Sequence, residues 1–315
     1  MNILRKIDQF FTNLYIGLKD RLRPRKTLRW ILITVLWLIV IIYLGFGIFF
    51  AVKVYKNHAE DRSTKFAVNI YPFPAAIINN GIVWAKDYYQ QLAYIRQFSL
   101  KTKQPVPEAA VLRTQIIDQL IENKLLEMQA LRYNITVSSK DVNDAYQKIV
   151  TQSGGTSEVN KVLNELYGMS ERDFKHLVHQ QVLKEKIQNE LITQVKVAHI
   201  LIKDEARANE IAARAKQGED FGALAKQYSE DTKSRDAGGE LGWLAKGQLV
   251  VDNNPIPEFD EAAFKVKVGE ITGPVKTGIG FEIIKVEDRK GKIDENFNTW
   301  LAGLKKQAKI WRLIR

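Results

Sequence analysis

The chain has 315 residues, of which 45% are apolar and 26% are charged, so it is too long for one ordinary domain and too apolar to be disordered. Its formal charge of +11 is uneven, because residues 1–29 hold eight Lys and Arg against two Asp. The mild basic surplus in the rest of the chain argues against nucleic acid as the main partner, since phosphate binding needs concentrated positive charge. The absence of cysteine excludes disulfides, thiolate metal sites and Cys nucleophiles.

An uncharged apolar run from Trp30 to Val52 follows the basic segment. A helix of this length measures about 35 Å and crosses a bilayer core of about 30 Å. The run is too long for the core of a cleaved signal peptide, and no cleavage site follows it, so we expect an uncleaved signal anchor. Because the positive charge precedes the span, we expect residues 1–29 in the cytoplasm and the rest of the chain outside. Residues 1–22 fit either a helix lying on anionic lipid or a juxtamembrane helix without function.

The exported part begins with residues 53–76, which we expect to form a linker because Pro72 and Pro74 forbid regular helix. Residues 77–195 then show helical apolar spacing and are expected to form a helical domain. Two pairs of capping residues spaced three apart predict helix starts near 139 and 171. The pairs are Ser138 with Asp141 and Ser170 with Asp173, and the helical stretches are Lys86–Ser99, 108–133 and Glu171 to about Gln194.

The pattern changes at Val195, where apolar and β-branched residues cluster as in a short buried strand. A β-α-α-β-α-β-β order follows, and it ends in a predicted antiparallel pair, Glu270–Lys276 with Phe281–Asp288. Beyond this pair, Asp294–Leu313 is predicted to be one more amphipathic helix. Its apolar side comprises Phe297, Trp300, Leu301, Leu304, Ala308 and Trp311.

Four segments, in chain order, carry a family resemblance. They are VAHILIK, FGALAKQYSEDTKSRDAGGELGWL, PEFDEAAF and GEITGPVKTGIGFEIIKV. With them, residues 196–289 resemble the parvulin family of peptidyl-prolyl isomerases: an opening strand with its His, a helix with an acidic loop and a Gly-Gly signature, a pocket helix, and closing strands. The flanking helical parts resemble, by arrangement, exported foldases of the SurA, PrsA and PpiD type, in which a parvulin domain is inserted before a last helix.

The resemblance implies an α+β protein with a single N-terminal transmembrane helix. It implies an all-α SurA-like chaperone domain over 77–195, completed by a C-terminal helix within 290–315. The inserted parvulin-like domain over 196–289 is expected to hold a four-stranded antiparallel sheet. We expect the last helix to pack on the helical domain, because a small sheet domain already covers its sheet with its own helices.

The resemblance also implies a site. The family's first active-site His corresponds to His199, its loop Cys or Asp to Asp231, and a hydrogen-bonding neighbour to Thr277. The family usually closes with Gly-aromatic-His, and here Phe281 stands at the aromatic position and Glu282 replaces the second His. We expect Glu282 either to face Asp231 near His199 or to point outward from an edge strand.

The apolar wall for the substrate proline corresponds to Leu241 and Phe259. Ile256 is the best match for a further pocket position, because 248–255 resembles an insertion. Rotating an X-Pro bond meets a barrier of about 18–20 kcal/mol, since the twisted state loses C–N delocalisation. An apolar pocket that strips water from the imide favours the less polar twisted state, so no nucleophile, metal or cofactor is required. Without the surrounding motifs, each of the predicted site residues could equally be an ordinary core residue or a residue of a solvated loop.

Two function classes follow from these observations. The first is a membrane-anchored prolyl isomerase that assists the folding of exported proteins. The alternative is a non-catalytic holdase with a degenerate parvulin domain, and Glu282 is the feature that separates the two. The expected partners are unfolded or newly exported polypeptides with X-Pro bonds and the bilayer around residues 30–52, with no nucleic acid. His176 and His179 lie three apart on a predicted helix, but a solvated helix face explains them better than a metal site.

Overall fold

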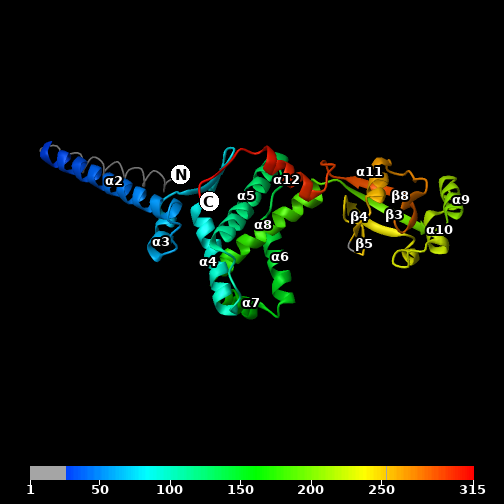
Figure 1. The fold of residues 1–315 in the computed structure, drawn as a ribbon, viewed down its shortest axis with the longest axis horizontal. Coiled ribbons are helices and arrows are strands. Elements are labelled where there is room, and N and C mark those ends of the chain that lie inside the picture. The colour runs from blue at the N-terminus through cyan, green and yellow to red at the C-terminus, as the bar shows by residue number, and fades with distance from the viewer. Residues whose placement is uncertain (1–25, 253) are drawn as a thin grey trace, which may run out of the picture.

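The computed structural model describes residues 26–252 and 254–315. The molecule is elongated and has three parts in sequence (Figure 1). The long helix α2 (Lys26–Tyr55) projects at one end, a group of helices lies in the middle, and a small sheet with its covering helices lies at the other end.

Helix α2 contains the predicted span. The segment Leu32–Tyr55 has a mean hydropathy of 2.7 and is the one helix among the described residues that is long and apolar enough to cross a membrane. Its side chains from Leu32 to Tyr43 are exposed, as expected for a helix surrounded by lipid. Of the predicted cytoplasmic segment 1–29, only residues 26–29 are described, as the start of α2, and the predicted surface helix within 1–22 lies outside the described residues.

The segment 53–76, which we expected to be a linker, is partly helical. It contains helix α3 (Arg62–Ile70), whose first amides are capped by the carboxylate of Asp61. Ala67 and Val68 of this helix are buried. Pro72 and Pro74 do not interrupt this helix, because both lie after its last residue, Ile70.

The middle part consists of the predicted helices and their connections. Both predicted capping boxes are present, at Ser138 and Ser170, and Asn134 ends the second helix in the left-handed conformation with φ 57°. The apolar faces of these helices pack in three buried clusters, which α4, α5 and α8 connect. The helices are α4 (Ala85–Thr102), α5 (Ala109–Tyr133), α6 (Ser139–Gln152), α7 (Thr156–Val162) continued by a π-helical turn (Leu163–Tyr167), and α8 (Glu171–Glu190).

This part is not all-α, which corrects the expectation. A three-stranded sheet in the order β2-β1-β9 covers one end of it. Strands β1 (Pro74–Ile78) and β2 (Gly81–Trp84) form a hairpin, and β9 (Ile310–Arg312) comes from the far end of the chain. Strand β9 was missed because its three residues pair with a strand more than 230 residues away, which no local pattern reveals.

The last helix, α12 (Phe297–Gln307), is shorter than predicted. The backbone becomes extended at Ala308 and then forms β9, so Trp311 lies on a strand and is 58% exposed. The buried residues Phe297, Trp300 and Leu301 pack with side chains from α5 and α8. The C-terminal segment therefore joins the helical part through both a helix and a strand.

The sheet part has the expected four antiparallel strands, in the order β4-β3-β8-β7. An extra short hairpin of β5 and β6 occupies the predicted insertion. The elements are β3 (Gln194–Ile202), α9 (Glu205–Lys216), α10 (Phe221–Tyr228), a 3-10 turn (Arg235–Ala237), β4 (Glu240–Ala245), β5 (Val250–Val251), β6 (Asn254–Pro255), α11 (Pro257–Lys265), β7 (Val275–Thr277) and β8 (Gly280–Lys290).

Alternation along β3 gives this sheet two buried faces. Ala198, Ile200 and Ile202 pack under α9 and α10, whereas Val195 and Val197 face α11. The chain enters and leaves the sheet part at one place, where the amide of Thr193 donates to the carbonyl of Ile293 at 2.8 Å. The sheet part is thus an insertion between α8 and α12.

Candidate functional site

His199 lies on β3, on the face that is covered by α11. His199 of β3 pairs with Ile284 of β8, and Leu201 pairs with Glu282. Glu282 is therefore two residues from the partner of His199, and its side chain lies on the same face of the sheet. Glu282 is 0% exposed and its strand lies between β3 and β7, so the alternative of an outward-facing edge residue is wrong.

Two carboxylates approach opposite nitrogens of the His199 ring. Nδ1 lies 2.7 Å from Oε2 of Glu282, and Nε2 lies 3.0 Å from Oδ2 of Asp231. Nε2 also lies 2.8 Å from the hydroxyl of Ser234, which donates to Oδ2 of Asp231 at 2.5 Å. The two carboxylates therefore flank the imidazole and do not face each other. With both nitrogens protonated, every one of these contacts has a donor and an acceptor.

The charges explain the pKa directions at the site. Burial lowers the pKa of His199, but hydrogen bonding and negative charge from Glu282 and Asp231 outweigh it, so this pKa is raised above its ordinary value. Burial raises the pKa of Asp231, yet hydrogen bonds from Ser234 and His199 outweigh it and lower the pKa to about 2. Both acidic neighbours therefore favour the protonated form of the His199 ring. The second oxygen of Glu282, Oε1, is buried and meets no hydrogen-bond partner among the described residues.

Hydrogen bonds to backbone groups hold the loop between α10 and β4 in place. The hydroxyl of Ser229 accepts from the amides of Leu201 and Asp231, at 3.2 and 3.3 Å. The amide of His199 donates to the carbonyl of Gly239 at 2.8 Å, and a Cβ at Gly239 would lie 2.2 Å from the carbonyl oxygen of His199. The second glycine of the Gly-Gly signature thus lets the loop approach β3, which brings Asp231 to the His199 ring.

Three predicted pocket residues share one apolar cluster beside His199. Phe259 and Ile256 are buried there, at the start of α11, and Leu241 is partly buried against them from β4. The Phe259 ring lies edge-on to the imidazole, with centroids 6.2 Å apart. The structure therefore brings these residues together with His199, Asp231 and Glu282.

Of the two remaining predicted site residues, Thr277 makes no hydrogen bond to His199, Asp231 or Glu282, and Phe281 lies on the other face of the sheet. Thr277 uses its hydroxyl within the β7–β8 turn, where it donates to the carbonyl of Gly280 at 3.0 Å. Phe281 lies on the opposite face of the sheet and packs under α9 and α10 with Tyr228 and Ile271. The reason is the strand period: Phe281 and Glu282 are neighbours on β8, so their side chains point to opposite faces.

Sequence reasoning missed Ser234 and Ile279. Ser234 is 3% exposed and touches both His199 and Asp231, and Ile279 packs against the apolar cluster. The signal for Ser234 was its position three residues after Asp231, in the acidic loop. Ile279 carried no signal beyond its place in a hairpin turn.

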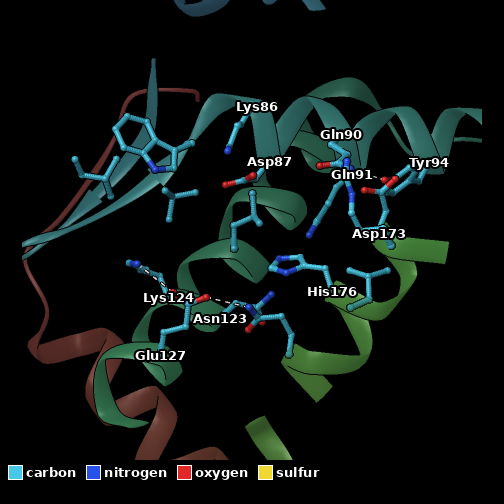
Figure 2. A pocket seen from close by; sticks show the side chains of 17 residues that line it. Lys86, Asp87, Gln90, Gln91, Tyr94, Asn123, Lys124, Glu127, Asp173 and His176 are labelled. Atoms are coloured by element: carbon cyan, nitrogen blue, oxygen red, sulfur yellow. Dashed lines mark hydrogen bonds and ion pairs between the residues drawn. The ribbon is translucent and has the colours of Figure 1, made fainter. Parts of the chain in front are cut away.

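A cavity lies in the helical part, between α4, α5 and α8. Its volume is about 500 Å³, and charged and amide side chains from all three helices point into it (Figure 2). His176 and Tyr94 line it. No group of side chains suited to hold a metal ion occurs in the described part of the chain.

Comparisons with known proteins match two overlapping stretches of the chain. Residues 180–290 match the PPIC-type PPIase domain family, and residues 74–196 match the SurA N-terminal domain family. The chain therefore contains a SurA-type N-terminal domain and a parvulin-type PPIase domain, and the resemblance drawn from the sequence is confirmed.

Several relatives carry the name foldase protein PrsA. The one from Caldanaerobacter subterraneus subsp. tengcongensis is 39% identical over 184 residues, which cover 56% of this chain and 56% of the relative. The one from Geobacillus kaustophilus is 35% identical over 195 residues, 58% of this chain and 64% of the relative. The chain thus spans between half and two thirds of the length of these relatives.

Solved structures are also similar. The crystal structure of the peptidylprolyl isomerase PrsA from Bacillus anthracis is 29% identical, covers 61% of this chain and 86% of its own, and superimposes with a TM-score of 0.31. The crystal structure of PrsA from Bacillus subtilis is 27% identical, covers 75% and 86%, and has a TM-score of 0.28.

Proposed function

We propose that the protein is a membrane-anchored, extracytoplasmic peptidyl-prolyl cis-trans isomerase and chaperone that assists the folding of exported polypeptides. The observation that carries this proposal is the pairing of His199 and Asp231 beside the Phe259 cluster within a PPIC-type domain. Names of the relatives, foldase PrsA, support the same function.

Two groups of residues would contribute to catalysis: the apolar residues around Phe259 and the polar residues around His199. Leu241, with Phe259 and Ile256 behind it, offers apolar surface to a proline ring. Loss of water around the imide favours the twisted state, in which the C–N bond has lost its partial double-bond character. Both nitrogens of His199 are engaged, so we assign His199 the role of holding Asp231 in place rather than that of a base or nucleophile.

Asp231 is the polar group that reaches the surface of the site. Its side chain is 20% exposed, whereas that of His199 is 5% exposed. We propose that the Asp231 carboxylate lies beside the imide of a bound X-Pro segment, where its fixed negative charge acts on the redistribution of charge during rotation.

A protease-coupled assay with a prolyl peptide tests the isomerase proposal on the full chain. We expect catalysis above the uncatalysed rate, and a loss of at least tenfold in Asp231→Asn. Asp236→Asn is the matched control, because Asp236 lies in the same loop with its side chain 83% exposed. A wild-type protein that does not accelerate the reaction would contradict the proposal.

The buried Glu282 favours the holdase as the second candidate. A fully buried carboxylate bound to His199 replaces the family's second His, and it adds negative charge at the site. A holdase suppresses the aggregation of an unfolded protein without accelerating prolyl isomerisation. Suppression by wild type and by Asp231→Asn to the same extent, with no isomerase activity in either, is the result expected of that alternative.

We propose the anchor and the domain division on separate grounds. The apolar helix α2 and the basic residues before it support a span at 30–52, with residues 1–29 cytoplasmic and the following parts outside. The single entry and exit at Thr193 and Ile293 supports a division into 77–195, an inserted 196–289, and 290–315.

A further inference from the structure

Helix α3 runs back along the end of α2. At its start, Lys53 of α2 pairs with Asp61 at 2.8 Å and donates to the hydroxyl of Ser63 at 2.9 Å. Just after its end, the ring of Tyr71 stacks on Tyr43 of α2, with centroids 4.6 Å apart. As the chain advances from Asp61 to Tyr71, its contacts on α2 therefore move back from Lys53 to Tyr43.

The contact of Tyr71 with α2 is specific. Its hydroxyl donates to the carbonyl of Tyr43 at 3.0 Å. A Cβ at Gly47 would lie 3.1 Å from the Tyr71 ring, so the ring fits against a glycine on the α2 surface. The side chains fix Tyr71 at the level of residues 43–47 of α2.

The length of α2 places that level inside the bilayer. Arg29 precedes the apolar run, and only 13 residues separate it from Tyr43. They measure about 20 Å of helix, which is less than the bilayer core of about 30 Å. Any span that keeps Arg29 out of the core therefore includes Tyr43, and Tyr71 beside it.

The free face of α3 carries two large apolar side chains, with Asn69 exposed beside them and Arg62 at the start of the helix. Phe66 and Ile70, four residues apart and so on one face, are 67% and 49% exposed. Thr64, Ala67 and Val68 are buried on the other side of the helix. A face with two large exposed apolar side chains, continuous with a membrane-spanning helix, suits lipid and not water.

We infer that α3 and Tyr71 enter the outer leaflet of the bilayer, where Phe66 and Ile70 contact lipid. This inference rests on the proposed span of α2. It places Ile70 deeper than Phe66, and it leaves Arg62, at the start of α3, among the headgroups. The SurA-type domain is thereby seated on the membrane surface, since the buried side of α3 belongs to the domain core.

The absence of cysteine from the chain allows a direct test with single-Cys variants. The full chain carrying Phe66→Cys or Ile70→Cys is labelled with an environment-sensitive fluorophore and reconstituted in phosphatidylcholine vesicles with or without nitroxide-labelled lipids. Leu100→Cys, at a residue of α4 that is 74% exposed, is the matched control, and Ile39→Cys in α2 reports on the span. Since these side chains are exposed, the labels leave the packing intact.

We expect acyl-chain nitroxides to reduce the emission at least twofold at positions 39 and 70, less at 66, and not at all at 100. Quenching at 39 with both 66 and 70 as bright as 100 would overturn the inference while leaving the span in place. No quenching at 39 would contradict the anchor itself. Nitroxides at the headgroup should quench position 66 more than position 70, and the reverse order would contradict the depth assigned to α3.

Discussion

At the scale of single residues, the ionisation of His199 controls how the site responds to pH. Its pKa is raised in the folded state, so its carboxylate contacts stabilise the fold fully below the unfolded value of about 6.5. That contribution is lost as the pH rises through the raised pKa. Asp231 behaves in the opposite sense: its pKa of about 2 means that its contribution is present above about 4 and disappears as the pH falls toward 2.

We predict that His199 titrates above His58, whose pKa is lowered by burial, in an NMR titration of the ring protons. Glu282→Gln keeps the shape of the side chain and removes its charge, so the pKa of His199 should fall in this variant. The stability advantage of wild type over Glu282→Gln should then shrink between pH 6 and pH 9. An unchanged His199 pKa in the variant would show that Glu282 is not its partner in solution.

The replacement Glu282→His tests whether the missing family histidine limits turnover. The replacement removes a buried carboxylate and brings a second imidazole next to His199. It also reduces the negative charge near Asp231. We expect prolyl isomerase activity to rise several-fold relative to wild type, with Glu282→Gln as the control for loss of charge alone. Unchanged activity in a folded variant would remove Glu282 from the mechanism.

Ser234 is predicted to be a positioning residue. Ser234→Ala removes the hydrogen bond to Oδ2 of Asp231, so the pKa of Asp231 should rise from about 2 toward its ordinary value. Loss of one buried hydrogen bond should cost about 1–3 kcal/mol in unfolding free energy. Thr232→Ala, at an exposed position in the same loop, is the control and should change neither quantity.

At the scale of elements, the second glycine of the signature is the tightest point between the loop and β3. Gly239→Ala should disrupt the sheet domain, because the new Cβ would lie 2.2 Å from the carbonyl oxygen of His199. Gly242→Ala is the matched control: its φ of 75° is also left-handed, but no atom lies within 4 Å of the new Cβ. We expect the control to cost only about 1–2 kcal/mol and the Gly239 variant clearly more, as measured by chemical denaturation.

Helices with local end signals were predictable from the sequence, whereas long-range pairing was not. The capping boxes at Ser138 and Ser170 encode helix starts within four residues, and the structure confirms both. Strand β9 depends on a partner at the other end of the chain, so no window of sequence contains its cause. For the site, family motifs identified His199, Asp231 and Glu282 but also Phe281, although adjacent strand residues cannot share a face. The alternation of side chains along a strand excludes Phe281 from the face that holds Glu282.

At the scale of the whole molecule, the proposed topology requires that everything after α2 lies outside the cytoplasm. The concentration of basic residues before Trp30 favours this orientation. We predict that protease added to intact cells with the outer face accessible digests the SurA-type and parvulin-type domains. Protection of these domains in intact cells, with digestion only after lysis, would reverse the orientation.

The middle part depends on both ends of the chain that follows α2, because α12 and β9 complete it from the far side of the inserted sheet domain. Lys305 of α12 pairs with Glu122 of α5 at 2.9 Å, and Arg312 of β9 pairs with Asp118 at 2.7 Å. Ile314, which follows β9, is 1% exposed within the core of α4 and α5. A chain cut before α12 would leave this core open.

Two tryptophans of the C-terminal segment provide the test. Trp300 is 8% exposed and packs against α5 and α8, whereas Trp311 is 58% exposed on β9. Trp300→Ala should therefore lower the unfolding free energy of the helical part by about 3–5 kcal/mol, as expected for a large buried side chain. Trp311→Ala removes the same atoms from the surface and should change it by no more than about 0.5 kcal/mol. If both variants unfold at the denaturant concentration of wild type, α12 does not dock on the helical part in solution, and the composite domain is wrong.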